Sequence, residues 1–371
     1  MNKRNRVLIV FNKYKQLGGE QITIENEFDY LQNFYETKLL SFKNNFGPSV
    51  LWSSFNLFSF LKTFYTVLTY RPKVLYINNL WYKASNAPLV AAFLFKNIDV
   101  YIKIHNYRLS CANSLHYRES IQCIECSVRN KSNSYKYKCY KNSLIMTYLV
   151  NKFSQFQFYL LAKRNVKKIF VLNNFQKELM VEAGLDKNKI FLTKNIVKIK
   201  PRDRGQNNIH NKFYFVGRYV EEKGILDLIS AWKELDTSNF ELHLIGQGPL
   251  DSFIDRDISN LQNIINHGSV SNQEIQTKIE DARALIFPTR LLEGQPTVIL
   301  EAMQQKIPVL SPKIPFIDSF SNNLDIETFE LCSASDLKKL INLYFDESFY
   351  QEQKNLWNKF SEDFFRNLPE F

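Results

Sequence analysis

The alternation of short apolar runs with amphipathic segments constrains the fold of this chain more than any other feature. Segments with helical spacing follow the runs, such as the one after Gly18-Gly19 that carries Ile24, Phe28 and Leu31 on one face. Strands that alternate with helices indicate a doubly wound parallel α/β sheet. Four runs in the first half have the length of buried strands: 7–11, 74–77, 100–104 and 168–172.

The pattern is interrupted once and then repeats. Residues 198–211 are polar, contain Pro and Gly and have little periodicity, so we interpret them as an interdomain linker. Helices are expected from Gly224 to Leu235, after a capping box that begins at Ser271, and from Pro296. We therefore predict two Rossmann-like domains, 1–200 and 201–371, whose sheets face each other across a cleft. The predicted strands of the second half are 213–216, 242–245, 264–267, 284–287 and 309–311.

The charge of the chain is divided unevenly. Residues 1–200 hold 31 Lys and Arg against 11 Asp and Glu, whereas residues 201–371 hold 17 against 26. A basic half suggests an anionic partner such as a membrane face, although a solvated lysine-rich surface has the same composition. The stretch 153–168 combines aromatic and basic residues, and we interpret it as a packed helix with a basic edge that could lie on a membrane.

No segment has the pattern of a signal peptide or of a spanning helix. The apolar run at 7–11 is too short for a signal peptide. The most apolar longer stretch, 51–70, is interrupted by Ser, Asn and Lys62. We expect a cytoplasmic protein that is peripheral on the inner face of the cell membrane.

Two strands of the second half end in residues suited to phosphate. Arg218 follows the strand 213–216, and Lys223 lies five residues later at the start of a helix. Ligands bind beyond the carboxyl ends of such strands, where two cations and helix N–H groups can converge on phosphates. Gly246 and Gly248 follow the next strand and allow a close ligand, but the full G-x-G-x-x-G fingerprint of nicotinamide cofactors is missing.

The stretch "LLEGQPTVILEAM" (291–303) holds two carboxylates at the start of a helix. Glu293 lies on the loop before Pro296, and Glu301 lies inside the helix. A carboxylate accepts hydrogen bonds and repels phosphate, so it suits the hydroxyls of a sugar or ribose. Carboxylates for hydroxyls and cations for phosphates together predict a nucleotide-sugar site.

An ordered set of motifs resembles the group 1 (family 4) retaining glycosyltransferases of the GT-B fold, of the bacterial surface-polysaccharide type. In the first half the similar segments are "RVLIVFNKYKQLGGE" and "IKIHNYRLSC". The E-x7-E signature is Glu293 to Glu301. The similar segments of the second half are "FVGRYVEEKG", "LIGQGPL", "HGSVS", "FPTRLLEGQPTVILEAM" and "PVLSP".

The resemblance implies a role for each matching residue. Arg218 and Lys223 would bind the donor pyrophosphate and stabilise the leaving group, and Glu293 would hold hydroxyls of the donor sugar. Glu301 would hold the ribose, and His105 would lie near the transferred sugar. Gly18 and Gly19 would let the N-terminal loop approach donor and acceptor. The other residues implied at the donor site are Gly217, Gly246, Gly248, Gly294, Gln295, Pro296 and Thr297.

The implied reaction is transfer of a sugar to a saccharide acceptor, which we expect to be lipid-linked. It needs no cofactor or catalytic metal, and the C-terminal helix is expected to cross back to the first domain. Gln295 and Thr297 depart from the family pattern, which leaves the donor open. A nucleotide-sugar epimerase of the GT-B fold and an inactive nucleotide-sugar binding protein are the alternatives, and no nucleic-acid motif accompanies the basic half.

Four of the five cysteines lie in one insert of the first domain, residues 106–145. A C-x2-C pair with two flanking cysteines could form a structural zinc site, or the thiols could simply be buried in a loop. A disulfide is not expected in a reducing compartment. The four cysteines are Cys111, Cys123, Cys126 and Cys139.

Overall fold

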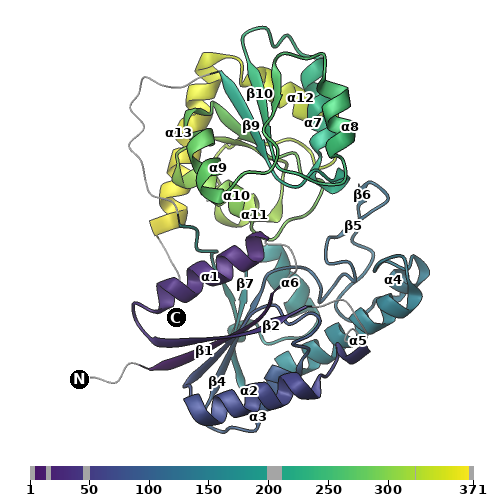
Figure 1. Ribbon diagram of the computed structural model, residues 1–371, viewed down its shortest axis with the longest axis vertical. Helices are drawn as coiled ribbons and strands as arrows, with labels where there is room; N and C mark the ends of the chain where they lie inside the picture. The colour runs from purple at the N-terminus through teal and green to yellow at the C-terminus, as the bar shows by residue number, and fades with distance from the viewer. Residues whose placement is uncertain (1–4, 14–17, 45–50, 199–210, 322, 367–371) are drawn as a thin grey trace. The chain divides into compact units, whose positions relative to one another are not determined.

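The structure is a computed structural model that describes residues 5–13, 18–44, 51–198, 211–321 and 323–366. The described chain forms two compact units (Figure 1). The first comprises the residues up to His116 together with Cys123–Ile196, and the second comprises Tyr117–Gln122 and the residues from Val197 onward. Most of the predicted linker, 199–210, lies outside the described residues.

A six-stranded parallel sheet forms the centre of the first unit, in the order β2-β1-β3-β4-β7-β8. Helix α1 lies on one face of this sheet, and α2 and α3 lie on the other (Figure 1). The strands are β1 (Arg6–Lys13), β2 (Glu36–Lys43), β3 (Val74–Ile77), β4 (Asp99–Ile104), β7 (Val166–Val171) and β8 (Ile190–Leu192). The helices are α1 (Gly19–Leu31), α2 (Leu57–Tyr70), α3 (Ala87–Phe93), α4 (Ser132–Lys136), α5 (Leu144–Leu161) and α6 (Asn174–Glu182).

The second unit contains a five-stranded parallel sheet in the order β11-β10-β9-β12-β13. Its strands are β9 (Lys212–Val216), β10 (Glu241–Ile245), β11 (Ile264–Asn266), β12 (Ala284–Ile286) and β13 (Val309–Leu310). Its helices are α7 (Ile225–Lys233), α8 (Asp251–Ile258), α9 (Asn272–Lys278), α10 (Thr297–Gln304), α11 (Pro315–Phe320), α12 (Ala334–Leu343) and α13 (Glu347–Arg366). A hairpin of β5 (Tyr117–Arg118) and β6 (Ile121–Gln122) also belongs to this unit.

Alternation along β9 places side chains in the cores on both faces of the second sheet. Phe213 and Phe215 belong to one apolar cluster, which α7, α8 and α12 complete, whereas Tyr214 belongs to the other. This division follows from the two-residue period of a strand. The C-terminal helix α13 contributes Trp357 and Phe360 to the second cluster. Its crossing to the first unit stays a prediction.

The prediction of a parallel α/β architecture is confirmed, and the predicted capping box at Ser271 is present. The face of α1 against the sheet is more polar than expected, because Glu27 is buried there while Phe28 is partly exposed. Glu27 forms an ion pair with the buried Lys103 of β4 and accepts a hydrogen bond from Tyr76 Oη at 3.1 Å. A buried charge requires such a partner, so α1 is held to the sheet by an ion pair as well as by apolar contacts.

Among the described residues, no helix has both the length and the apolar character needed to cross a membrane. The stretch 153–168 falls partly in α5, whose Phe153, Ser154 and Leu160 are buried against the first unit. The prediction that this stretch packs as a helix is confirmed for its α5 part.

Candidate functional site

The second unit brings Lys223 and Glu293 together. Lys223 ends a short 3-10 turn after β9, and Glu293 lies in the loop between β12 and α10. Lys223 Nζ lies 2.5 Å from Glu293 Oε1, and Thr289 Oγ1 donates a hydrogen bond to the same oxygen at 3.3 Å. The two charged side chains are 28% and 18% exposed, so a ligand can reach both. A paired and accessible cation and carboxylate can bind a phosphate and a hydroxyl, respectively.

Gly224 fixes the position of Lys223. Its φ of 70° is left-handed, and a Cβ at this position would lie 1.8 Å from the carbonyl oxygen of Pro288. Only glycine can therefore occupy a turn that packs directly against the loop leading to Glu293. The sequence "EEKG" thus brings together two loops that are about 70 residues apart in the chain.

The glycines after β9 and β10 let two strand-end loops touch. Gly246 has a φ of 153°, and a Cβ there would lie 1.8 Å from the carbonyl oxygen of Gly217. A Cβ at Gly248 would lie 2.4 Å from the carbonyl oxygen of Tyr219. Close packing of the two loops therefore accounts for Gly246 and Gly248, and their contact with a donor stays a prediction. Arg218 follows Gly217, is exposed, and forms no ion pair within the described parts of the chain.

Glu301 lies on α10 with its carboxylate half-buried. Burial raises the pKa of this carboxyl to about 7, and no side-chain hydrogen bond to it is present among the described residues. A raised pKa marks a carboxyl that lacks polar partners, which a ligand hydroxyl could supply. Pro296 is the residue before the first helical position, Thr297, so the helix begins one residue later than predicted. Gly294 and Gln295 are buried in the loop beside Glu293.

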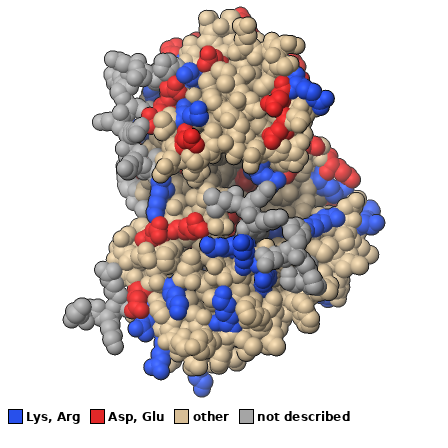
Figure 2. Space-filling view, in the orientation of Figure 1, with Lys and Arg blue, Asp and Glu red and all other residues tan. Residues whose placement is uncertain are grey.

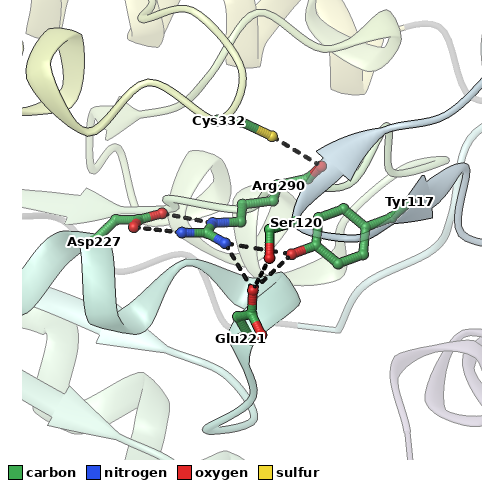
Figure 3. A network of polar contacts seen from close by, with 6 residues as sticks. All are labelled: Tyr117, Ser120, Glu221, Asp227, Arg290 and Cys332. Atoms are coloured by element: carbon green, nitrogen blue, oxygen red, sulfur yellow. Dashed lines mark hydrogen bonds and ion pairs between the residues drawn. The ribbon is translucent and has the colours of Figure 1, made fainter.

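A polar network ties these loops to the β5–β6 hairpin (Figure 3). Arg290 binds both carboxylate oxygens of Asp227, at 2.7 and 2.6 Å, and lies 3.0 Å from Glu221 Oε1. Tyr117 Oη and Ser120 Oγ of the hairpin donate hydrogen bonds to the same oxygen of Glu221. The bond from Ser120 is the main cause that lowers the pKa of Glu221. Arg290 and Glu293 share one loop, and Glu221 and Lys223 share one turn, so the network links the segments that carry the candidate pair.

In the first unit, His105 follows β4 and contacts Asn78, which follows β3. His105 Nε2 lies 2.7 Å from Asn78 Oδ1, so this nitrogen carries the proton and donates. Burial lowers the pKa of His105 well below its usual value, which keeps the imidazole neutral. Both residues line a small cavity of about 30 Å³. Gly18 precedes α1 in extended backbone, Gly19 is its first residue, and a Cβ at Gly18 would meet open space.

The four cysteines of the insert form no disulfide within the described residues. Cys111 is buried and bonds to Asn113, whereas Cys123, Cys126 and Cys139 are partly exposed. In the part of the chain that the structure describes, no group of three or more His, Cys, Asp or Glu side chains is placed to hold a metal ion. The structural zinc site of these four cysteines therefore stays a prediction.

Sequence reasoning assigned no site role to Glu20, Asn78, Arg290 or the hairpin. Glu20 directly follows the Gly-Gly pair, and burial raises its pKa to about 7. The signal for a polar interior was present in Lys103, a charged residue within the otherwise apolar strand 100–104. Nothing in the sequence indicates that residues 117–122 contact residues 221 and 290.

Comparisons with known proteins agree with this geometry. Residues 210–329 match the model of the glycosyl transferases group 1 family. A Klebsiella pneumoniae protein of 41.2 kDa, uncharacterized and encoded in the cps region, is 24% identical over 205 residues. TuaC of Bacillus subtilis, assigned to teichuronic acid biosynthesis as a glycosyltransferase, is 27% identical over 139 residues. These matches cover 52% and 38% of the chain and only 55% and 34% of the two relatives.

The fold is GT-B. The crystal structure of Anabaena Alr3699/HepE in complex with UDP and glucose superposes with a TM-score of 0.66 at 13% sequence identity. The match covers 96% of this chain and 94% of that one. At this identity the likeness shows the fold, and the predicted fold class is confirmed.

Proposed function

We propose that this protein is a retaining glycosyltransferase that transfers a sugar from a nucleotide-sugar donor to a saccharide acceptor in bacterial surface-polysaccharide synthesis. The observation that carries the proposal is the Lys223–Glu293 pair, held at 2.5 Å at the carboxyl ends of the second sheet. The family match over residues 210–329 and the cps-region and teichuronic-acid relatives support it.

In the proposed reaction, the bond between the sugar C1 and the leaving phosphate oxygen breaks while the acceptor oxygen bonds to C1 on the same face. The acceptor hydroxyl loses its proton to the leaving phosphate. Arg218 and Lys223 bind the pyrophosphate and offset its growing negative charge, which is the kind of interaction that dominates such catalysis. Glu293 binds hydroxyls of the donor sugar, and Glu301 binds the ribose.

The test is a thermal-shift screen of the full chain against UDP, GDP and a panel of activated sugars. A ligand that binds the folded state raises its stability with the logarithm of ligand concentration over Kd, so we expect one nucleotide to stand out. Slow donor hydrolysis without acceptor would then separate a transferase from an inactive binding protein. NMR of the product would show a retained anomeric configuration, and conversion of the donor sugar itself would indicate the epimerase instead. Absence of any nucleotide shift would refute the proposal.

The acceptor is proposed to be lipid-linked, with the first unit bound to an anionic membrane through α2. The usual amphipathic pattern is reversed in this helix, with polar side chains on the buried face and apolar ones on the exposed face. Its buried face carries Ser59, Thr63 and Thr66, whose hydroxyls bond to backbone carbonyls. Its exposed face is mostly apolar, with Lys62 and Thr69 as the polar exposed residues. The exposed apolar residues at helical spacing are Leu57, Phe58, Leu61, Tyr65 and Leu68.

Charge around α2 favours an anionic bilayer over other occupants of this face. Residues 37–98 contain seven Lys and Arg and no Asp or Glu. Basic side chains are also spread over the first unit on the face drawn in Figure 2. Each basic residue close to an anionic leaflet contributes about 1 kcal/mol to binding. Apolar residues that enter the interface add the hydrophobic contribution.

Co-sedimentation with vesicles tests this membrane face. Wild type is expected to bind vesicles containing anionic lipid at low salt and to bind neutral vesicles less. Leu61→Ser is expected to lower binding about tenfold, because one buried leucine is worth roughly 1.5–3 kcal/mol. Leu343→Ser is the matched control, since Leu343 is a similarly exposed leucine on α12 of the second unit. Equal binding of both variants, or a wild-type dimer that Leu61→Ser abolishes, would overturn the membrane assignment.

A further inference from the structure

Thr289 is a completely buried polar residue in the loop between β12 and α10 of the second unit. It precedes Glu293 by four residues, and 0% of it is exposed to solvent. A valine has nearly the same shape and would fill the same space without a polar group. A buried hydroxyl costs free energy unless it is hydrogen-bonded, so the partners of this hydroxyl indicate its role.

The Thr289 hydroxyl has two partners, and their chemistry fixes the direction of both hydrogen bonds. The backbone N–H of Leu291 donates to Thr289 Oγ1 at 3.2 Å. Thr289 Oγ1 also lies 3.3 Å from Glu293 Oε1. An N–H can only donate and an ionised carboxylate can only accept, so the single hydroxyl proton points toward Glu293. Thr289 therefore connects the backbone at Leu291 to the carboxylate of Glu293.

The backbone of Glu293 adopts a conformation that residues other than glycine disfavour. Its φ is 29°, on the left-handed side of the allowed range. Such conformations cost free energy and persist only where the surrounding structure holds them. Leu291 and Leu292 are buried and anchor the loop. The Thr289 hydroxyl extends this anchored part of the loop to the Glu293 side chain.

Thr289 and Lys223 bond to the same carboxylate oxygen. Lys223 Nζ lies 2.5 Å from Glu293 Oε1, but it comes from a different loop and is partly exposed. A phosphate can therefore draw the ammonium away from the carboxylate. Thr289 is buried and shares its loop with Glu293, so its hydrogen bond does not depend on Lys223. The carboxylate keeps this partner when the cation turns to a ligand.

We propose that Thr289 is a positioning residue whose hydroxyl holds the Glu293 carboxylate toward the donor sugar while Lys223 binds the donor phosphate. The inference rests on the proposed function. It deepens that function by naming a group that keeps Glu293 in place once the Lys223–Glu293 pair separates. Thr289 acts through Glu293 and is not itself a catalytic residue.

Steady-state kinetics of donor hydrolysis by the full chain test this role. UDP-glucose, UDP-galactose, UDP-N-acetylglucosamine and GDP-mannose are compared, and the donor that wild type hydrolyses fastest is used. Thr289→Val keeps the shape but removes the hydroxyl, and it is expected to lower kcat about tenfold, because a hydrogen bond to a charged group is lost. Thr289→Ser keeps the hydroxyl and is expected to stay within about threefold of wild type.

Thr147→Val is the matched control for the loss of a buried threonine hydroxyl. Thr147 lies on α5, is equally buried, and accepts a hydrogen bond from the backbone N–H of Tyr140 at 3.0 Å. Its kcat is expected to equal that of wild type. Thermal unfolding gives the folded fraction of each variant, and kcat is expressed per folded molecule. Thr289→Ala is measured in the same way if the valine variant does not fold.

Donor analogues that lack one sugar hydroxyl at a time separate positioning from a purely structural role. Glu293→Gln identifies the hydroxyl that Glu293 binds, because removal of that hydroxyl costs this variant less than it costs wild type. The same removal is expected to cost Thr289→Val less as well, since a misplaced carboxylate no longer binds the hydroxyl. A purely structural role would lower turnover of every analogue by the same factor.

Four results would overturn the assignment of Thr289. They are unchanged turnover in Thr289→Val, an equal loss in Thr147→Val, no recovery in Thr289→Ser, and an equal loss for every analogue. A wild-type chain that neither binds nor hydrolyses a nucleotide sugar would instead refute the proposed function, so the two failures are distinguishable.

Discussion

The candidate groups of the two units differ in whether they already have interaction partners. In the second unit, Lys223 and Glu293 already satisfy each other at 2.5 Å. In the first unit, Glu20 Oε1, Asn78 Nδ2 and Arg108 Nε are buried without partners. A phosphate that binds Lys223 must therefore compete with Glu293, whereas a ligand at these groups of the first unit replaces nothing. The difference teaches that a ligand must separate two charged side chains in the second unit, whereas in the first unit a ligand can form hydrogen bonds without breaking others.

The largest loss of activity is expected when the cation of the Lys223–Glu293 pair is removed. Lys223→Ala is expected to lower turnover of the identified donor by about 100-fold or more, because a group that stabilises charge in the transition state is lost. Lys338→Ala is the control, since Lys338 pairs with the exposed Glu234 and its side chain is 38% exposed. Turnover within twofold of wild type would show that the pair is structural only.

Substitutions in the polar network of Figure 3 test whether the Lys223–Glu293 pair depends on that network for its position. Arg290→Leu is expected to lower kcat about tenfold, because the loop of Glu293 loses its bidentate tie to Asp227. Arg290→Lys is expected to restore part of the activity, since a lysine keeps the charge but not the planar fork. Tyr117→Phe removes one hydrogen bond and is expected to cost less than either.

The readout for this positioning role is the split between kcat and KM for the donor. A lowered kcat with rescue by lysine supports positioning, whereas loss of folding without an effect on kcat per folded molecule argues against it. Arg256→Leu on α8 is the control, because the exposed side chain of Arg256 hydrogen-bonds to the backbone of Ser252 in its own helix.

The smallest expected effect is on the pH dependence of the free energy of unfolding, to which both units should contribute in the same direction. Burial raises the pKa of Glu20 and of Glu301 to about 7. Between the unfolded value of 4.5 and 7, the folded chain binds more protons than the unfolded chain, so stability falls as pH rises through this window. Each carboxyl is expected to contribute about 1 kcal/mol or less per pH unit.

Urea unfolding at pH 5, 6, 7 and 8 measures this decline in wild type and in Glu20→Gln and Glu301→Gln. Each glutamine variant is expected to flatten the curve, because an amide does not ionise. Glu25→Gln should leave the slope as it is. A slope that neither variant changes would mean that both carboxyls keep their ordinary pKa in the fold.

Much of the fold could be predicted because buried parallel strands are continuous apolar runs. The expected strand at 74–77 matches β3, and those of the second half match β9 to β13 within one residue or so. The strands β2 and β8 were not predicted. In β2 only two of the eight residues are buried, so its apolar pattern is weak.

The sites were predictable only where a local motif carried them. Lys223 and Glu293 were expected together from their family pattern, and the structure pairs them. Glu20 was not predicted as a site residue, because a single glutamate after a Gly-Gly pair has no distinctive local pattern. Arg290 contacts Tyr117, which lies more than 100 residues away in the sequence, and no local pattern predicts such a contact.

The hairpin also limits how this protein can be divided into fragments. Residues 117–122 are covalently part of the N-terminal half of the sequence, yet they belong to the second compact unit. A fragment cut at the linker would leave Glu221 and Arg290 without Tyr117 and Ser120. Chimaeras that exchange C-terminal halves would therefore need to exchange this six-residue segment as well, so the transplantable module is discontinuous in sequence.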